Sequence, residues 1–137
     1  LREEPIVYLN GLPYVLRRID HPFANLEHTG ISRTRVEDME NRMKQDVLDE
    51  VANDLNGMVL LHEEDESGAL RPSWERVESV LTSQELCRAY AEEFQAKHGR
   101  KLLYVRIPIT DEQAPKPAAF DTILAICALV SLFPERK

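Results

Sequence analysis

The stretch Arg106-Ile-Pro-Ile-Thr-Asp-Glu-Gln-Ala-Pro-Lys-Pro-Ala-Ala-Phe-Asp121 decides how this chain is interpreted. The apolar run Leu102-Leu-Tyr-Val-Arg-Ile107 leads into it and predicts a buried strand. Pro108 and Pro115 restrict the backbone on either side of an acidic tip. A last helix is expected to begin near Pro117, because proline is favoured at the first helical position. The stretch therefore predicts a strand, a braced loop and a helix in succession.

The chain opens with two short β-prone runs, Ile6-Val-Tyr-Leu9 and Tyr14-Val-Leu16. The pair Asn10-Gly11 stands between them and is a strong cue for a two-residue hairpin turn. We therefore expect a hairpin at the start of the chain.

Two amphipathic helices are predicted from capping boxes, a polar residue followed three positions later by Glu. Thr34 with Glu37 begins the first helix, which is expected to end near Asn56-Gly57. Thr82 with Glu85 begins the second, which is expected to stop near Gly99. The first helix carries one apolar stripe at helical spacing, formed by Val36, Met39, Met43, Val47, Val51 and Leu55.

The region between these helices predicts further sheet. The continuous apolar run Met58-Val-Leu-Leu61 indicates a buried, parallel strand, and His62 to Gly68 is expected to be an exposed acidic loop. Arg71 to Leu81 fits a helix, a strand or an irregular segment, with Trp74 as a core anchor. The alternation predicts an α/β fold, a mainly parallel sheet flanked by helices.

Composition narrows the class of protein. The net charge of −7 argues against a nucleic-acid binder, although a local basic pocket can still bind phosphate. The longest apolar stretch, around Ile123 to Val130, is shorter than the roughly 20 residues needed to span a bilayer. No signal peptide is visible, and two cysteines suggest no disulfide framework, so a cytoplasmic location is expected.

The carboxylate pair Asp111 and Glu112 has two interpretations. The loop leaves the carboxyl end of a predicted strand, where open α/β sheets place ligand crevices. A phosphate ester leaves as an alkoxide, and a carboxylic acid beside it can donate the proton that its oxygen needs. Alternatively, Thr110 and Asp111 form only a turn or a helix cap, because both residue types favour such positions.

Several stretches, taken in order, resemble the opening portion of a paladin-like phosphatase repeat, similar to the protein-tyrosine-phosphatase-like phytases. The resemblance covers about Pro5 to Phe133. It is carried by Ile6-Val-Tyr-Leu-Asn-Gly-Leu-Pro-Tyr-Val-Leu-Arg17, Gly30-Ile31, Val36-Glu37, Met39-Glu40, Met43-Lys44, Met58-Val-Leu-Leu-His-Glu63, Trp74-Glu75 and Tyr104-Val-Arg-Ile-Pro-Ile-Thr-Asp-Glu112.

The resemblance implies a phosphatase fold, a cysteine thiolate nucleophile, a phosphate loop closed by Arg and an Asp general acid. Asp111 matches the acid position, and Glu112 beside it is expected to face the substrate. The implied reaction is phosphomonoester hydrolysis on inositol phosphates or phosphoproteins, with no metal or organic cofactor.

No Cys-x5-Arg spacing occurs in the 137 residues. Residues 1–137 are therefore expected to be the N-terminal portion of a phosphatase-like domain, processed or excised because they begin at Leu1 rather than Met. The alternative is a non-catalytic phosphatase-like interaction module.

The remaining reactive residues have ordinary explanations. Cys87 and Cys127 do not fit a nucleophile, because neither has a following Arg at the required spacing or glycines to cradle phosphate. Both are expected in the core, because free cysteines are usually buried. His62 with the four acidic residues after it could suggest a metal, but their consecutive spacing favours a solvated loop. Arg17-Arg18 and His21 fit either an anionic-ligand pocket or a solvated hairpin end.

The last predicted helix is apolar all round. Such a helix is normally buried on every side. We therefore expect the chain alone to self-associate or to need the remainder of its domain. The apolar residues are Phe120, Ile123, Leu124, Ile126, Cys127, Leu129, Val130, Leu132 and Phe133, with Ala118, Ala119, Ala125 and Ala128 between them.

Overall fold

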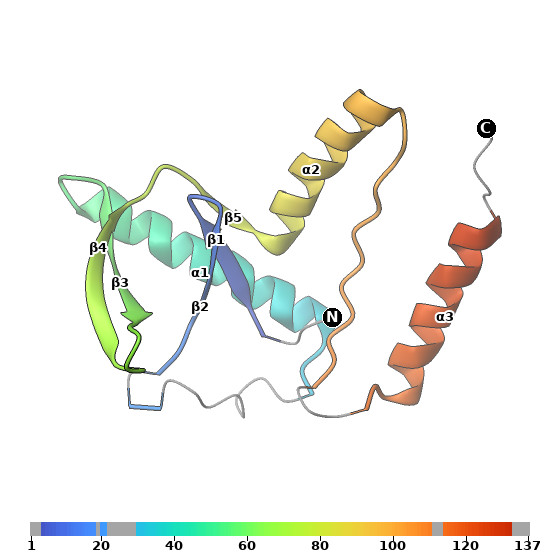
Figure 1. Ribbon diagram of the computed structural model, residues 1–137, viewed down its shortest axis with the longest axis horizontal. Helices are drawn as coiled ribbons and strands as arrows, with labels where there is room; N and C mark the ends of the chain where they lie inside the picture. Colours follow the sequence, from blue (N-terminus) through green and yellow to red (C-terminus); the bar gives the residue numbers. More distant parts are fainter. Residues whose placement is uncertain (1–3, 19, 22–29, 111–113, 133–137) are drawn as a thin grey trace.

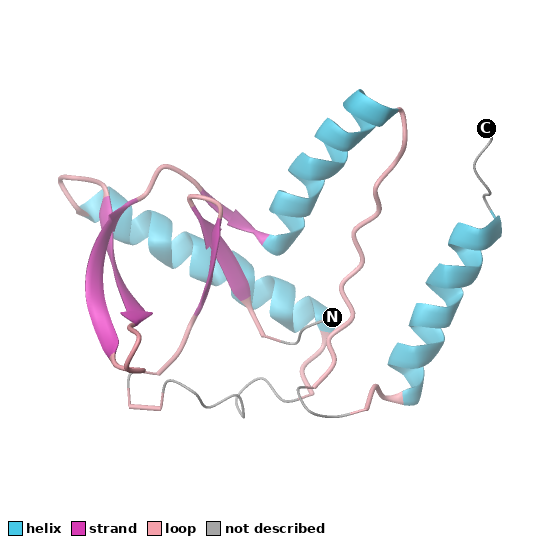
Figure 2. Cartoon of the chain, in the orientation of Figure 1, coloured by secondary structure: helices cyan, strands magenta, loops and turns pink. Residues whose placement is uncertain are grey.

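The computed structural model describes residues 4–18, 20–21, 30–110 and 114–132 (Figure 1). In Figure 1, α1 passes across the strands and α3 stands apart from them, while Figure 2 separates helices, strands and connecting segments by colour. The elements in chain order are β1 (Ile6–Leu9), β2 (Leu12–Val15), α1 (Arg33–Asn53), β3 (Met58–Glu64), β4 (Leu70–Arg76), β5 (Val80–Thr82), α2 (Ser83–His98) and α3 (Pro117–Leu132).

The predicted hairpin at the start of the chain is confirmed. Strands β1 and β2 pair antiparallel, with Leu9 opposite Leu12 across the turn. Asn10 and Gly11 both have positive φ, 49° and 84°, as a type I′ turn requires. The Asn10 side chain accepts hydrogen bonds from two backbone N–H groups, of Glu78 at 2.8 Å and of Ser79 at 3.1 Å. These bonds tie the turn to the segment before β5. Strand β5 itself pairs with the other edge of β1.

A second hairpin, between β3 and β4, corrects the predicted fold class. The chain reverses at Asp65, whose Oδ1 accepts from the backbone N–H groups of Ser67 and Ala69 at 2.9 and 3.0 Å. Strands joined by so short a turn must run antiparallel. Every strand pair among the described residues is antiparallel, in the sheets β2-β1-β5 and β3-β4. The prediction of a mainly parallel sheet is therefore wrong, and the helices accompany small antiparallel sheets instead.

The predicted strand from Leu102 to Ile107 is also not formed. Residues 100–110 have no regular secondary structure. Residues 101–105 and 107–110 form no backbone–backbone hydrogen bond with the described part of the chain. This segment crosses from the end of α2 toward α3 (Figure 1).

The apolar core lies where α1 covers the strands. The apolar stripe of α1 is confirmed near its middle, because Val36 and Met43 are buried, but Leu55 lies beyond the helix end and is fully exposed. Trp74 is 58% exposed on β4, so the prediction of a core anchor there is wrong. The main cluster comprises Val7, Leu9, Met43, Val59 and Val80, with Tyr14, Val47, Leu61 and Val77 packed against it.

The helix ends show which capping signals determine the boundaries. The Thr82–Glu85 capping box is present in full, and α2 ends at Gly99 with φ of 67°. For α1, Ser32 is the N-cap and its side chain accepts from the Arg35 N–H at 3.3 Å. The predicted start at Thr34 is therefore late, because Ser32 provides an equally good capping hydroxyl two positions earlier.

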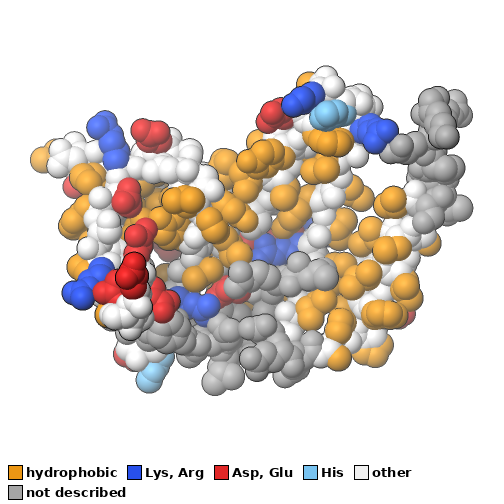
Figure 3. Space-filling view, in the orientation of Figure 1, with side chains coloured by type: hydrophobic (Ala, Val, Ile, Leu, Met, Phe, Trp, Pro, Cys, Tyr) orange, Lys and Arg blue, Asp and Glu red, His pale blue; other side chains and the backbone are white. Residues whose placement is uncertain are grey.

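Helix α3 begins at Pro117 as predicted and has little cover. Phe120, Leu124, Leu129 and Val130 are each more than half exposed. Figure 3 shows hydrophobic side chains gathered over this helix. Cys127 is exposed as well, which contradicts the prediction that it lies in the core, while Cys87 is half-buried. Within the described part of the chain, no helix is both long and apolar enough to cross a membrane.

Candidate functional site

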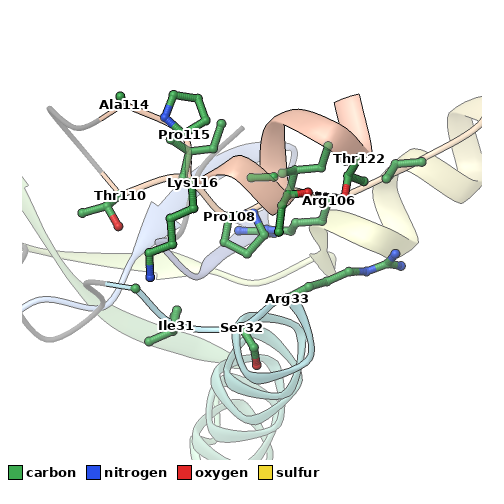
Figure 4. Close-up of a pocket in the computed structure, with 16 residues that line it drawn as sticks. Ile31, Ser32, Arg33, Arg106, Pro108, Thr110, Ala114, Pro115, Lys116 and Thr122 are labelled. Atoms are coloured by element: carbon green, nitrogen blue, oxygen red, sulfur yellow. Dashed lines mark hydrogen bonds between the residues drawn. The ribbon is translucent and has the colours of Figure 1, made fainter. Parts of the chain in front are cut away.

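A pocket of about 390 Å³ opens between the start of α1, the segment leading to the acidic loop and the first turns of α3 (Figure 4). Residues 30–33, residues 105–110 and several residues between 114 and 122 contribute to its lining. The lining residues are Gly30, Ile31, Ser32, Arg33, Val105, Arg106, Ile107, Pro108, Ile109, Thr110, Ala114, Pro115, Lys116, Ala118, Ala119 and Thr122.

Cationic side chains line the pocket, although the chain as a whole is acidic. Three cationic side chains line it, Arg33, Arg106 and Lys116, and none of its described lining residues is Asp or Glu. Arg33 pairs with Glu37 outside the pocket, at 2.8 Å between Nε and Oε1. Arg106 pairs with Glu40, so two of the three cations are offset by carboxylates on α1.

Lys116 carries the pocket charge that is least compensated. Figure 4 shows its side chain reaching from the loop toward the start of α1. Its Nζ lies 3.6 Å from where a side-chain carbon on Gly30 would stand. Gly30 has φ of 72°, so glycine is favoured here by the backbone conformation, and 3.6 Å would be an ordinary contact for a side-chain carbon. Lys116 forms no salt bridge with another described residue.

Arg106 is fixed by a buried network. Its Nη1 lies 2.5 Å from Oε1 of Glu40, and its Nη2 donates to the Glu4 carbonyl at 2.8 Å. Glu40, on α1, is 1% exposed and is the most deeply buried charged side chain among the described residues. Its carboxylate also accepts from the Ile6 N–H at 3.0 Å and from the Ser83 hydroxyl at 3.0 Å. The network joins β1, α1, α2 and the segment that lines the pocket.

The protonation state of this network follows from its contacts. Burial by itself lowers the pKa of Arg106, but the adjacent Tyr104 hydroxyl and the Glu40 carboxylate outweigh it and raise that pKa. The guanidinium is therefore charged at all ordinary pH values. Burial raises the pKa of Tyr104, with the Arg106 charge opposing the shift. The buried pair of Glu40 and Arg106 is stabilised because both of its partners make further hydrogen bonds.

The predicted acid residues, Asp111 and Glu112, lie outside the described residues. The residues on either side of them, Thr110 and Ala114, both line the pocket. The sequence thus places the carboxylate pair between two residues of the pocket wall. The acid role of Asp111 stays a prediction.

The other sequence candidates lie away from this pocket. Arg17 pairs with Glu4, and Arg18 pairs with Asp20 on the surface at 2.6 Å. His21 is 69% exposed. These observations favour the solvated hairpin end over an anion pocket. No cluster of three potential metal ligands occurs in the described ranges, and His62 lies on β3 rather than in the predicted loop.

Sequence reasoning missed Glu40 and Lys116. Glu40 follows Val36 by one helical turn and precedes Met43, so it occupies the apolar face of α1. A lone acidic residue on an apolar face signals a buried partner, and this signal was present in the sequence. Lys116 had no comparable signal, because its approach to Gly30 joins positions that are distant along the chain.

The described fold is similar to that of a phosphatase. It matches the structure of the PTP-like myo-inositol phosphatase from Mitsuokella multacida in complex with myo-inositol-(1,3,4,5)-tetrakisphosphate, with a TM-score of 0.60 and 21% sequence identity. The match covers 93% of this chain and 18% of that chain, so the present chain spans a small part of its relative's length. The described part of the chain therefore has a fold like part of a PTP-like phosphatase.

The family follows from the sequence as a whole. The profile of the PTP-like phytase family, described as inositol hexakisphosphate, matches residues 1–132. The chain belongs to the PTP-like phytase family. No curated protein matches the chain.

Proposed function

We propose that this chain is the acid-loop portion of a cysteine-dependent phosphatase that hydrolyses phosphomonoesters, on inositol phosphates or phosphoproteins. The observation that carries the proposal is the cationic pocket whose wall includes Thr110, the residue before Asp111. A phosphate ester is a dianion, so a pocket with lysine and arginine and no described carboxylate suits it. We place the reaction in the cytoplasm, where a nucleophilic thiolate stays reduced.

In the proposed reaction this chain supplies the general acid, and other residues of the full-length protein supply the nucleophile. A cysteine thiolate attacks phosphorus and the bond from phosphorus to the leaving oxygen breaks. Asp111 transfers its carboxylic proton to that oxygen. Water then hydrolyses the phosphocysteine, with Asp111 as the base, and the thiolate is regenerated. Glu112, beside the acid, faces the substrate. This chemistry needs neither a metal nor an organic cofactor.

The test is phosphate release by the full-length protein from inositol hexakisphosphate and from an alkyl phosphate. Asp111→Asn should lower these rates by roughly 10²–10⁴-fold, the usual contribution of general acid catalysis. The loss should shrink on p-nitrophenyl phosphate, whose leaving group needs little protonation. Glu112→Gln is the matched control and should not reproduce this dependence on the leaving group. An Asp111→Asn variant with the wild-type rate on the alkyl phosphate would assign the acid elsewhere.

Two further results separate the enzyme from its alternative. A full-length protein that binds inositol phosphates or phosphoproteins without releasing phosphate would support a phosphatase-like interaction module. The 137-residue chain alone is expected to be inactive, because neither Cys87 nor Cys127 begins a Cys-x5-Arg loop. Turnover by the isolated chain that disappears on Cys127→Ser would contradict the proposal.

We also propose that a further part of the domain, or a second copy of the chain, covers α3. A groove of about 450 Å³ runs between residues 101–107 and α3, and most of its lining is apolar. Each large apolar side chain left in water forgoes about 1.5–3 kcal/mol, so cover from another segment is strongly favoured.

A further inference from the structure

The Arg106 side chain ties the segment that leads into the acidic loop to buried groups of the core. Residues 101–105 and 107–110 form no backbone–backbone hydrogen bond with described residues, and Ile107 contributes a buried apolar contact. Arg106 instead donates to Glu40 at 2.5 Å and to the Glu4 carbonyl at 2.8 Å. The Arg106 guanidinium therefore ties this segment to the core.

Glu40 fixes that guanidinium from a rigid base. It lies within α1, a helix of 21 residues, and is 1% exposed. Its carboxylate is held by the Ile6 N–H at 3.0 Å, from β1, and by the Ser83 hydroxyl at 3.0 Å and N–H at 3.3 Å, at the start of α2. A carboxylate bound from β1 and from α2 cannot turn without breaking several hydrogen bonds, so it locates Arg106 closely.

We propose that Glu40 is a positioning residue for the phosphatase reaction, acting through Arg106 to hold residues 106–110 at the wall of the pocket. The inference rests on the proposed function, because the proton donor follows Thr110 in the chain. Glu40 touches neither substrate nor the reacting atoms. A misplacement of about 1 Å in a catalytic group can cost about 10²-fold in rate, so the anchor matters for catalysis as well as for folding.

The test compares Glu40→Gln with Glu85→Gln in the full-length protein. Both changes remove a carboxylate charge at the junction of α1 and α2, but Glu85 bonds to Lys44 and Thr82 rather than to residues 101–110. The activity readout is kcat on an alkyl phosphate divided by kcat on p-nitrophenyl phosphate. Glu40→Gln should lower this ratio by about tenfold or more, and Glu85→Gln should keep the wild-type ratio. A merely structural role lowers both rates together and leaves the ratio unchanged.

Limited digestion with trypsin gives a second readout that needs no activity, because Lys101 lies at the start of the segment. Glu40→Gln should speed cleavage after Lys101 more than cleavage after Arg42 within α1, whereas Glu85→Gln should not. If Glu40→Gln does not fold, the double variant Glu40→Gln/Arg106→Gln removes both charges of the buried pair. It should fold and still show the low ratio and the fast cleavage after Lys101.

The outcomes separate this inference from the proposed function. If Asp111→Asn lowers the ratio and Glu40→Gln does not, Glu40 is structural only and the inference is overturned. If Asp111→Asn leaves the ratio unchanged, the proposed acid is wrong, and limited digestion still decides whether Glu40 holds the segment. Uniformly faster cleavage in Glu40→Gln, without a local excess after Lys101, also overturns the inference.

Discussion

The Lys44 ammonium lies 2.7 and 2.8 Å from the two carboxylate oxygens of Glu85, and this pair joins α1 to the first turn of α2. The Glu85 carboxylate also accepts from the Thr82 N–H at 2.9 Å, within the capping box. Burial alone raises the pKa of Glu85, but Lys44 and Thr82 outweigh it and lower that pKa from its ordinary value of 4.5.

The stability of the protein should therefore depend on Glu85 in a particular pH range. A depressed pKa in the folded state stabilises the fold above the ordinary value, and this stabilisation is lost as pH falls through the folded-state pKa. Glu85→Gln should lower the free energy of unfolding at neutral pH by at most about 1 kcal/mol, because solvent screens a side chain that is 37% exposed. Urea unfolding from neutral pH to below about pH 4 measures the difference between wild type and variant. A difference that stays constant over this range would contradict the assignment.

The stripe of α1 should contribute unequally to stability along its length. Met43 is 9% exposed within the core cluster, so Met43→Ala should lower the free energy of unfolding by about 2–5 kcal/mol. Leu55→Ala is the matched control, because Leu55 belongs to the same sequence pattern but is fully exposed. Its effect should lie near zero in the same urea titration. Equal losses for the two variants would mean that Leu55 is covered in the natural protein.

The exposed apolar surface of α3 should make the isolated 137-residue chain associate. Two or three uncovered large side chains offset a large part of a domain stability of roughly 5–15 kcal/mol. Sedimentation at micromolar concentration should show oligomers or aggregates, and a dye for apolar surface should bind. A monodisperse, dye-negative chain that melts cooperatively would show that α3 is covered from within.

The two cysteines should report on the same surface. Cys127 on α3 is exposed and Cys87 on α2 is half-buried, so a bulky thiol reagent should modify Cys127 first in the isolated chain at high dilution. At high concentration, or in the full-length protein, the rate at Cys127 should fall if α3 is covered there. Mass analysis of peptides containing each cysteine measures both rates. Equal reaction of Cys127 in every form would mean that its face of the helix stays open.

Local signals predicted the elements whose causes lie within a few residues. Asn10-Gly11 gave the hairpin, the Thr82–Glu85 box gave the start of α2, and Gly99 gave its end. Each depends on contacts between near neighbours in sequence. The second hairpin had a local signal as well, the Asp65 turn, which the acidic composition of the surrounding residues obscured.

The errors share a different cause. An apolar run such as Met58 to Leu61 predicts burial, but strand direction depends on which partner it finds. Here the partner is the next segment of the same hairpin, so the pair is antiparallel. In the site too, local features could be predicted and contacts between distant positions could not. The loop with Asp111 was visible in sequence, whereas the contact of Arg106 with Glu40 joins positions 66 residues apart.

The Asn10-Gly11 turn is also a site where the protein can deamidate slowly. In an Asn-Gly sequence the glycine nitrogen can attack the asparagine side-chain carbonyl and convert the amide to a carboxylate. The Asn10 side chain is occupied in the fold, because Nδ2 donates to the Arg76 carbonyl at 2.7 Å and Oδ1 accepts from two backbone N–H groups. Deamidation must wait until these bonds open. Once it occurs, a new carboxylate faces the Arg76 carbonyl and repels it, so ageing at this one amide would loosen the joint between the hairpin and β4.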